Sequence, residues 1–384
     1  MQKIYYWSPC LTKVGTHRST INSAISLAKY SSKDFKVSII NTCGEWNDTK
    51  KILVDNNIEI LNFGYNYFQY LPKIGFFGSR ISYLIIILTS IIPLLRLLRR
   101  EKPNFIIIHL LTALPLLFLK LFNFKTKFIL RISGYPKLKF LRKILWKSIS
   151  DKIFKVSCPS KELLNQLYNL KIFTKEKLFF LPDPILNIKK ISKMIRCEKD
   201  NFKNEFKEKN YFLSAGRLTK QKNFEYLIEE FIKFSKEKPD YKLLIFGEGE
   251  DKNKLLNKIY KNNLEKKIFL MGYTSNIYSY MKNANAFILS SLWEDPGFVL
   301  IESAMCNLFI ISSNCKNGPS EFLENGKGGI LFESNKDNAL KDALNEFLIT
   351  KNLNEKKILT KRNCKKYTIF RHFHLLKKIL INGS

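Results

Sequence analysis

The sequence predicts an α/β protein of two domains, each a parallel sheet covered by helices. Its 384 residues are enough for two to three domains at about 150 residues per domain. Apolar residues make up 45% and charged residues 26%, which excludes a disordered, collagen-like or disulfide-stapled chain. Short apolar runs alternate with helical patterns, and continuous apolar strands separated by helices are typical of parallel sheets buried on both faces.

The second half of the chain shows this alternation clearly. Five apolar runs predict strands over residues 211–215, 242–246, 268–271, 286–289 and 308–311. Each run ends in a Gly- or Ser-containing loop, and ligands bind beyond the carboxyl ends of strands in such sheets. For any single glycine a turn without function is the simpler explanation, but several such loops at one sheet edge predict a site.

The first half repeats the pattern more loosely, with strands expected over residues 4–7, 36–40, 105–109 and 128–132 and a helix over 21–30. Pro182-Asp183-Pro184 ends this part, and a stretch rich in Lys, Asn and Glu follows it. We therefore expect a first domain over 1–188 and a second over 189–365. A helix within 366–384 is expected to pack back on the body.

The basic excess of the chain is concentrated in one region. Lys and Arg number 65 against 33 Asp and Glu, a net charge of +32. Between residues 60 and 150 fifteen basic residues accompany a single acid, Glu101. A coding bias toward Lys explains the total, but not this local absence of carboxylates. An anionic partner is the other explanation, and no helix-turn-helix, zinc-finger or RNP-type signature points to nucleic acid.

Long apolar runs within the basic region favour a membrane surface as that partner. Residues 81–95 carry no charge, but a bilayer span takes about twenty apolar residues and Pro93 interrupts the run, so we expect a buried or interfacial helix. The segment 137–147 places Leu138, Leu141, Leu145 and Trp146 near helical spacing among lysines. An ordinary amphipathic helix with its apolar stripe in the core is the alternative.

The cysteines and the amino terminus bear on the compartment. Seven Cys, without a C-x-x-C pair, argue against a disulfide framework or a zinc site and favour a reducing compartment. The first residues enter an apolar run without the basic, apolar and small-residue order of a signal peptide. We therefore expect a cytoplasmic protein, peripheral on the inner face of the cell membrane.

Two constellations in the second half carry the chemistry. Glu294 and Glu302 flank Pro296-Gly297, where a loop turns into a helix whose first N–H groups favour an anion. The loop after residues 211–215 carries Arg217 and Lys222, two cations that suit a diphosphate. Acids that merely favour a helix start, and chance pairs in a Lys-rich chain, are the alternatives.

These motifs, with Gly247-Glu248-Gly249-Glu250 between them, resemble the retaining GT-B glycosyltransferases of family four. The resemblance covers most of residues 205–345, and the first half only in outline. It implies two Rossmann-like domains whose parallel sheets face a central cleft. It also implies transfer of a sugar from a nucleotide-diphosphate donor, without a metal, and the Asp295-Pro296 insertion and the loop 317–321 resemble the subgroup that builds bacterial surface polysaccharides.

Site residues follow from the resemblance position by position. Glu294 is expected near the donor sugar as a catalytic residue and Glu302 on the ribose hydroxyls. The other donor-binding residues are expected to be Gly216, Arg217, Lys222, Gly272, Tyr273, Gly297 and Phe298. His109 is a second catalytic candidate, although some relatives place their His two positions later, and a satisfied core His is the alternative.

The acceptor side is expected to include Gly15, in a loop with fewer glycines than the family usually has, and Arg131. The partners implied are a nucleotide sugar, a lipid-linked glycan acceptor and the anionic membrane, with no nucleic acid. A sugar-nucleotide epimerase of the same fold is a runner-up, and a peripheral membrane scaffold with a decayed site is an alternative from another class. No Asp-x-Asp pair suits a metal at a strand end.

Overall fold

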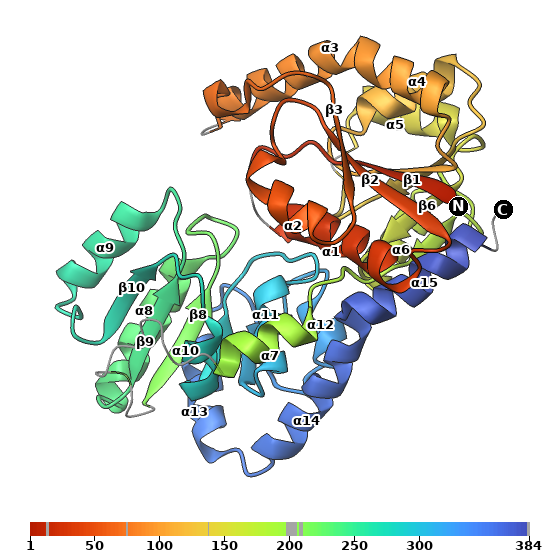
Figure 1. Ribbon diagram of the computed structural model, residues 1–384. Helices are drawn as coiled ribbons and strands as arrows, with labels where there is room; N and C mark the ends of the chain where they lie inside the picture. Colours follow the sequence, from red (N-terminus) through yellow and green to blue (C-terminus); the bar gives the residue numbers. More distant parts are fainter. Residues whose placement is uncertain (13–14, 74–75, 137, 197–205, 207–209, 382–384) are drawn as a thin grey trace. The chain divides into compact units, whose positions relative to one another are not determined.

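The computed structural model describes residues 1–384 except 13–14, 74–75, 137, 197–205, 207–209 and 382–384. The chain divides into two compact units (Figure 1). The first contains Met1–Ile185 with Ile369–Ser384, and the second contains Leu186–Thr368. Part of the lysine-rich segment predicted to separate the domains lies outside the described residues. Lys13, Val14, Lys137 and Cys197 also lie outside them.

The first unit is built on a seven-stranded parallel sheet with the order β3-β2-β1-β4-β5-β6-β7. Its strands are β1 (Gln2–Trp7), β2 (Phe35–Asn41), β3 (Glu59–Asn62), β4 (Phe105–Ile108), β5 (Lys127–Arg131), β6 (Lys155–Cys158) and β7 (Leu178–Phe180). The central strands are largely apolar because both faces are covered. Successive residues alternate between two hydrophobic cores: Tyr5 belongs to one and Ile4 to the other.

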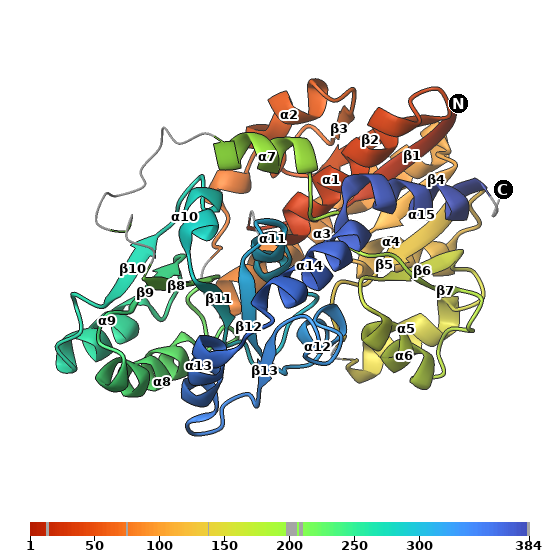
Figure 2. The ribbon, with the colours of Figure 1, turned by 90° about the horizontal axis from the view of Figure 1, so that it is seen from below.

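Helices on the two faces of this sheet complete those cores. The helices are α1 (Gly15–Tyr30), α2 (Lys50–Val54), α3 (Phe76–Glu101), α4 (Ala113–Leu121), α5 (Phe140–Ile149), α6 (Lys161–Asn169) and α15 (Ile369–Ile381). Side chains of α3 to α6 share the core that contains Tyr5, and those of α1, α2 and α15 share the one that contains Ile4. The last helix therefore returns to the first unit, where it lies beside α1 (Figures 1 and 2).

The second unit has a six-stranded parallel sheet with the order β10-β9-β8-β11-β12-β13. Its strands are β8 (Tyr211–Ala215), β9 (Lys242–Phe246), β10 (Ile268–Gly272), β11 (Ala286–Leu289), β12 (Phe309–Ser313) and β13 (Ile330–Phe332). The helices are α7 (Ile188–Arg196), α8 (Phe224–Glu237), α9 (Lys252–Lys261), α10 (Tyr278–Asn283), α11 (Phe298–Met305), α12 (Pro319–Phe322), α13 (Ala339–Ile349) and α14 (Leu353–Asn363). Helices α8, α9 and α13 share one core with the strands, while α11 and α14 contact β12.

The predicted α/β architecture with two parallel sheets is confirmed, and the structure adds elements that the sequence did not reveal. Strands β7 and β13 are only three residues long, and the four-residue strands β3 and β6 contain polar residues, so their apolar runs carry too little signal. Pro93 does not interrupt α3, which continues through it to Glu101. The expected lipid-facing residue Trp146 is instead 4% exposed and packs against Phe173, because the apolar stripe of α5 faces the core there.

Candidate functional site

Loops at the carboxyl edge of the second sheet pack against one another backbone to backbone. A Cβ on Gly247, at φ +140°, would lie 1.9 Å from the carbonyl oxygen of Gly216. A Cβ on Gly249 would lie 2.2 Å from that of Leu218. Only glycine permits such approach. The glycines after β8 and β9 therefore bring two strand ends together, and each has a steric reason for its place.

Lys222 and Glu294 form a buried ion pair at this edge. Lys222 Nζ lies 2.5 Å from Glu294 Oε1, and the side chains are 15% and 6% exposed. Ser291 Oγ donates a hydrogen bond of 2.6 Å to the same oxygen. Gly216 leaves room for the lysine, because a Cβ there would lie 2.9 Å from Lys222 Cε. The structure therefore joins the two predicted constellations, one after β8 and one after β11.

Glu302, the second carboxylate, is held by a tyrosine from another helix. The hydroxyl of Tyr278, at the start of α10, donates a hydrogen bond of 2.6 Å to Glu302 Oε1. Glu302 lies on α11 and is 5% exposed. Tyr278 could not be predicted from the sequence, since it lies inside no strand-end motif. Its only signal is a polar aromatic residue at a helix start, which is too common to single out.

The amino terminus of α11 lies between the two carboxylates along the chain. Gly297 caps the helix in the left-handed conformation, at φ +91°. The N–H groups that begin at Phe298 form the first turn, where a helix has unpaired donors and a partial positive charge. A Cβ on Gly318 would lie 2.4 Å from Pro296 O, so the loop after β12 packs closely on this turn. These groups can bind an anion.

The remaining donor-side residues lie at the same edge but are not joined to this pair. Arg217 is exposed, and none of the described residues forms an ion pair with its guanidinium. Gly272 ends β10 with φ +68°, and Tyr273, which follows it, is 83% exposed. The side chains of Arg217 and Tyr273 are therefore accessible to a ligand, and the backbone turns sharply at Gly272.

In the first unit, His109 follows β4 and is buried. It is 3% exposed, and its Nδ1 lies 3.5 Å from Ser8 Oγ in the loop after β1. Its Nε2 is buried and has no hydrogen-bond partner among the described residues. Burial, followed by the charge of Arg131, lowers the pKa of His109 well below its usual value. The ring is therefore neutral at physiological pH, with one nitrogen unused.

Arg131 has an internal partner. It ends β5, is 6% exposed, and pairs with Asp183 and the hydroxyl of Ser19. A buried arginine in such a pair ties β5 to α1 and to the segment after β7. Gly15 is the first residue of α1. The structure therefore places both expected acceptor residues near the carboxyl edge of the first sheet. The charge of Arg131, however, is paired with Asp183 inside the unit.

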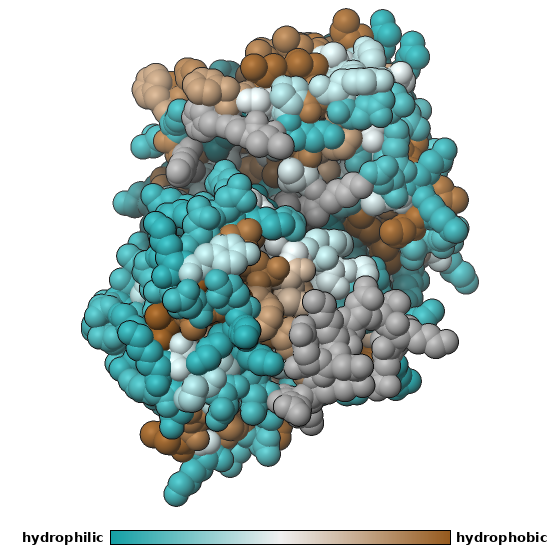
Figure 3. Space-filling model, turned by 90° about the vertical axis from the view of Figure 1, so that its left-hand side faces the viewer, coloured by the Kyte–Doolittle hydropathy of each residue, from teal (hydrophilic) through white to brown (hydrophobic). Residues whose placement is uncertain are grey.

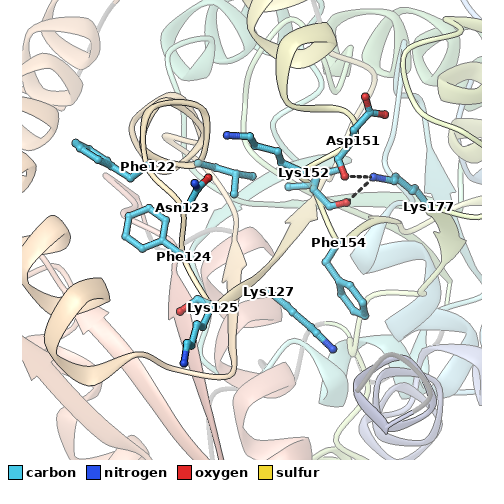
Figure 4. Close-up of a pocket in the computed structure, with 12 residues that line it drawn as sticks. Phe122, Asn123, Phe124, Lys125, Lys127, Asp151, Lys152, Phe154 and Lys177 are labelled. Carbon is cyan, nitrogen blue, oxygen red and sulfur yellow. Dashed lines mark hydrogen bonds between the residues drawn. The ribbon is translucent and has the colours of Figure 1, made fainter.

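One pocket lies at the opposite edge of the first sheet (Figure 4). It has a volume of about 480 Å³ and is lined by the residues around the amino ends of β5 and β6. The amine of Lys177, which lines the pocket, donates hydrogen bonds to the backbone carbonyls of Ser150, Asp151 and Ile153. Ligands of open parallel sheets bind at the other edge, so this pocket is separate from the candidate site. Among the described residues no group of three or more His, Cys, Asp or Glu is arranged to hold a metal ion.

Comparisons with known proteins connect this geometry to a family. Residues 196–364 match the sequence profile of the family Glycosyl transferases group 1. An uncharacterized glycosyltransferase of Methanocaldococcus jannaschii is 31% identical over 258 residues, which is 62% of each chain. An N-acetylgalactosamine-N,N'-diacetylbacillosaminyl-diphospho-undecaprenol 4-alpha-N-acetylgalactosaminyltransferase of Campylobacter jejuni is 36% identical over 138 residues, or 36% of this chain and 37% of that one. The matches therefore span less than two thirds of either relative.

Solved structures share the whole fold. A glycosyltransferase from Rickettsia africae superimposes with a TM-score of 0.76 at 18% identity, over 100% of this chain and 98% of that one. A mutant of TarM from S. aureus, in complex with fondaparinux, alpha-GlcNAc-glycerol and UDP, gives 0.73 at 16% identity, over 99% and 100%. These likenesses show the GT-B fold. Over residues 196–364 the chain is similar to the glycosyl transferases group 1 family.

Proposed function

We propose that the protein transfers a sugar from a nucleotide-diphosphate donor to a lipid-linked or polysaccharide acceptor in the synthesis of a surface glycan. One observation carries the proposal: two buried carboxylates, Glu294 and Glu302, flank the amino terminus of α11 and are each held by a partner from another element. A sugar nucleotide offers hydroxyl groups on both sides of a diphosphate. Carboxylates on both sides of an anion-binding helix start match that arrangement.

The donor would be held by the second unit. Arg217, Lys222 and the N–H groups that begin at Gly297 and Phe298 would bind the diphosphate. An ammonium has three donors, so Lys222 can keep Glu294 and still reach a phosphate oxygen. Glu302, held by Tyr278, would accept hydrogen bonds from the ribose hydroxyls. The turn at Gly272 and Tyr273 would border the base.

The reaction exchanges one bond at the anomeric carbon. The bond to the diphosphate oxygen breaks, the acceptor hydroxyl oxygen bonds to the carbon, and the hydroxyl proton passes to the leaving diphosphate. Departure on the same face would retain the configuration. The cations and the helix terminus stabilise the leaving diphosphate, so we expect no metal cofactor. Glu294, on the sugar side, would orient the hydroxyls of the transferred sugar.

The first unit would present the acceptor. His109, neutral and with a free Nε2, would accept or donate one hydrogen bond toward the transferred sugar. Gly15 starts the helix that follows the loop after β1, close along the chain to Ser8. The name of the Campylobacter relative includes an undecaprenol-linked acceptor. Together with the basic region of the first unit, this supports a lipid-linked acceptor and a peripheral position on the cytoplasmic membrane face.

A sugar-nucleotide epimerase of the same fold and a scaffold without activity are the competing functions. The buried Lys222–Glu294 pair is intact, which counts against a decayed site. A thermal-shift screen over UDP, GDP, ADP and their sugars identifies the donor, since binding stabilises the folded state. With the donor and a lipid-linked acceptor, we expect a glycosylated lipid and one nucleoside diphosphate per transfer. A changed donor sugar without transfer to the lipid would establish the epimerase, and no nucleotide binding would establish the scaffold.

A further inference from the structure

Helix α3 is apolar on its outward side as well as on the side that faces the core. Its outward stripe is apolar, with exposed fractions of 77, 53, 56, 59 and 59% for Phe77, Ile81, Leu84, Leu88 and Ile92. Its inward face contains the buried Ile86, Leu94 and Leu98 together with Ser82 and Ser90. A helix on a water-facing surface normally has apolar side chains only toward the core and polar ones outward. The pattern therefore indicates an apolar medium outside α3.

The neighbouring helices extend this stripe into a broader surface. Exposed apolar side chains of α4 are Leu117 and Leu121, and those of α5 are Phe140, Leu141 and Ile144. Helices α3, α4 and α5 cover the same face of the first sheet and contact one another in that order. Figure 3 shows hydrophobic atoms gathered at the top of the view, where α3 lies. We call these ten side chains, five of them from α3, the apolar surface. Contiguous surfaces of this kind mark interaction sites.

Basic side chains lie on or next to the same helices as the apolar surface. The exposed cations include Arg80, Arg96, Arg99, Arg100, Lys120, Lys139, Arg142, Lys143 and Lys147. The single acid of this region, Glu101, is paired with Lys3 at 2.8 Å. Exposed apolar side chains accompanied by exposed cations are complementary to a bilayer with anionic headgroups. We propose that the apolar surface inserts into an anionic lipid bilayer, with α3 lying in the plane of the membrane.

The packing of α3 argues for an in-plane orientation over a transmembrane one. The described residues contain one helix that is long and apolar enough to cross a membrane, Phe77–Glu101. However, Ile86, Leu94 and Leu98 on its inward face are 0, 0 and 1% exposed and belong to the cores of the first unit. Ser82 Oγ also donates 2.6 Å to Pro72 O. A transmembrane position would withdraw these residues from their core, whereas in-plane insertion keeps every contact.

The biological reason for membrane insertion rests on the proposed function, because a lipid-linked acceptor requires an enzyme at the bilayer. The evidence for insertion is separate, since it comes from α3, α4 and α5 and not from the donor site. The apolar surface lies within the residues that the sequence predicts to meet a membrane, 73–147. The structure buries Trp146 but leaves Leu141 and the outward side of α3 exposed.

The first experiment is flotation of the full chain with vesicles of equal parts phosphatidylglycerol and phosphatidylcholine. We expect the wild type to bind at low salt. The partition coefficient of the Leu84→Gln/Leu88→Gln variant should be lower by a factor of about ten or more. The matched control is Ile349→Gln/Ile358→Gln, which changes two apolar side chains of the second unit that are 79 and 59% exposed. The control should bind like the wild type. Equal loss in both variants, or no binding of the wild type, would overturn the proposal.

The second experiment measures depth. Tryptophan is placed singly at Phe77, Leu84 and Ile92, and quenching by brominated lipids is recorded relative to the wild type. Equal depth at the three positions supports an in-plane helix. Depth that increases steadily from Phe77 to Ile92 would contradict the orientation and show a transmembrane helix.

Two controls separate this proposal from the others. Binding of UDP, GDP or ADP, by thermal shift, should be the same in the wild type and in Leu84→Gln/Leu88→Gln. Loss of vesicle binding with unchanged nucleotide binding supports the apolar surface, while vesicle binding without nucleotide binding leaves it standing and overturns the proposed function. Sedimentation velocity tests the other occupant: a wild-type dimer that the variant dissociates, without lipid binding, would show a second copy on this surface.

Discussion

Lys222 and Glu294, which are 72 residues apart in sequence, share one buried contact of 2.5 Å between Nζ and Oε1. Ser291 donates to the same carboxylate oxygen at 2.6 Å. Each charge therefore depends on the other for its compensation, because neither side chain is more than 15% exposed. A residue of the loop after β8 thus fixes the position of the carboxylate after β11.

The first prediction concerns this pair. Glu294→Gln should lower transfer by about thirty- to several-hundredfold, because a charged acceptor for a sugar hydroxyl contributes roughly 2 to 4 kcal/mol. It should also destabilise the second unit by on the order of 2 kcal/mol, since Lys222 is left without its counterion. The double variant Lys222→Met/Glu294→Gln should regain most of that stability but no activity. Denaturant unfolding and steady-state kinetics measure the two effects, and near wild-type turnover in Glu294→Gln would disprove the role.

The second prediction concerns Tyr278. Tyr278→Phe removes the hydroxyl that donates to Glu302 and keeps the ring, so the fold should be unchanged. We expect KM for the donor to rise about tenfold or more, because one hydrogen bond to a charged group contributes about 1.5 to 3 kcal/mol. Preference for the ribonucleotide over its 2′-deoxy analogue should fall. If KM and this preference stay unchanged, Glu302 does not depend on Tyr278.

The third prediction tests the close approach of the loops after β8 and β9. Gly249→Ala should abolish donor binding and lower the thermal stability, because its Cβ would lie 2.2 Å from Leu218 O. Gly326→Ala is the matched control: its φ is +92°, but nothing lies within 4 Å of the added Cβ. It should cost only the strain of a left-handed residue, about 1 kcal/mol. Similar effects in the two variants would refute the steric explanation.

The fourth prediction concerns pH. His372 of α15 bonds Ser23 Oγ at 2.8 Å and Pro182 O at 2.8 Å, and burial, followed by the charge of Arg131, lowers its pKa to about 3. The unfolded chain, with a His pKa of about 6.5, takes up the proton first. Stability is therefore complete above that pKa and decreases as pH falls from about 6.5 toward 3, by about 2 kcal/mol at pH 5.

The measurement compares urea unfolding at pH 7.5 and pH 5.0. His372→Gln should be less stable at both values but should show a smaller decrease between them. His374→Gln, exposed on the same helix, serves as the control and should keep the wild-type decrease. An unchanged decrease in His372→Gln would show that other groups, such as the buried His109, carry the acid sensitivity.

Much of the fold could be predicted because its signal is local. The strands β8, β9 and β11 are apolar over four or five residues, and such runs between helices allow little other than a buried parallel sheet. The alignment of Glu294, Glu302, Arg217 and Lys222 at strand ends also followed from sequence, because parallel strands finish at one edge. The short strands β7 and β13 carried too few residues to be recognised.

What the sequence by itself determined was the alternation of strands and helices, the residue types at the strand ends and the charge of the first unit, because each depends on neighbours along the chain. Only the tertiary structure decided that Lys222 forms an ion pair with Glu294 and that Tyr278 donates a hydrogen bond to Glu302. It also decided that Arg131 pairs with Asp183 and which side of α3 faces outward. A helix that is apolar on every side has no periodicity from which its buried face can be predicted, so packing alone selects it.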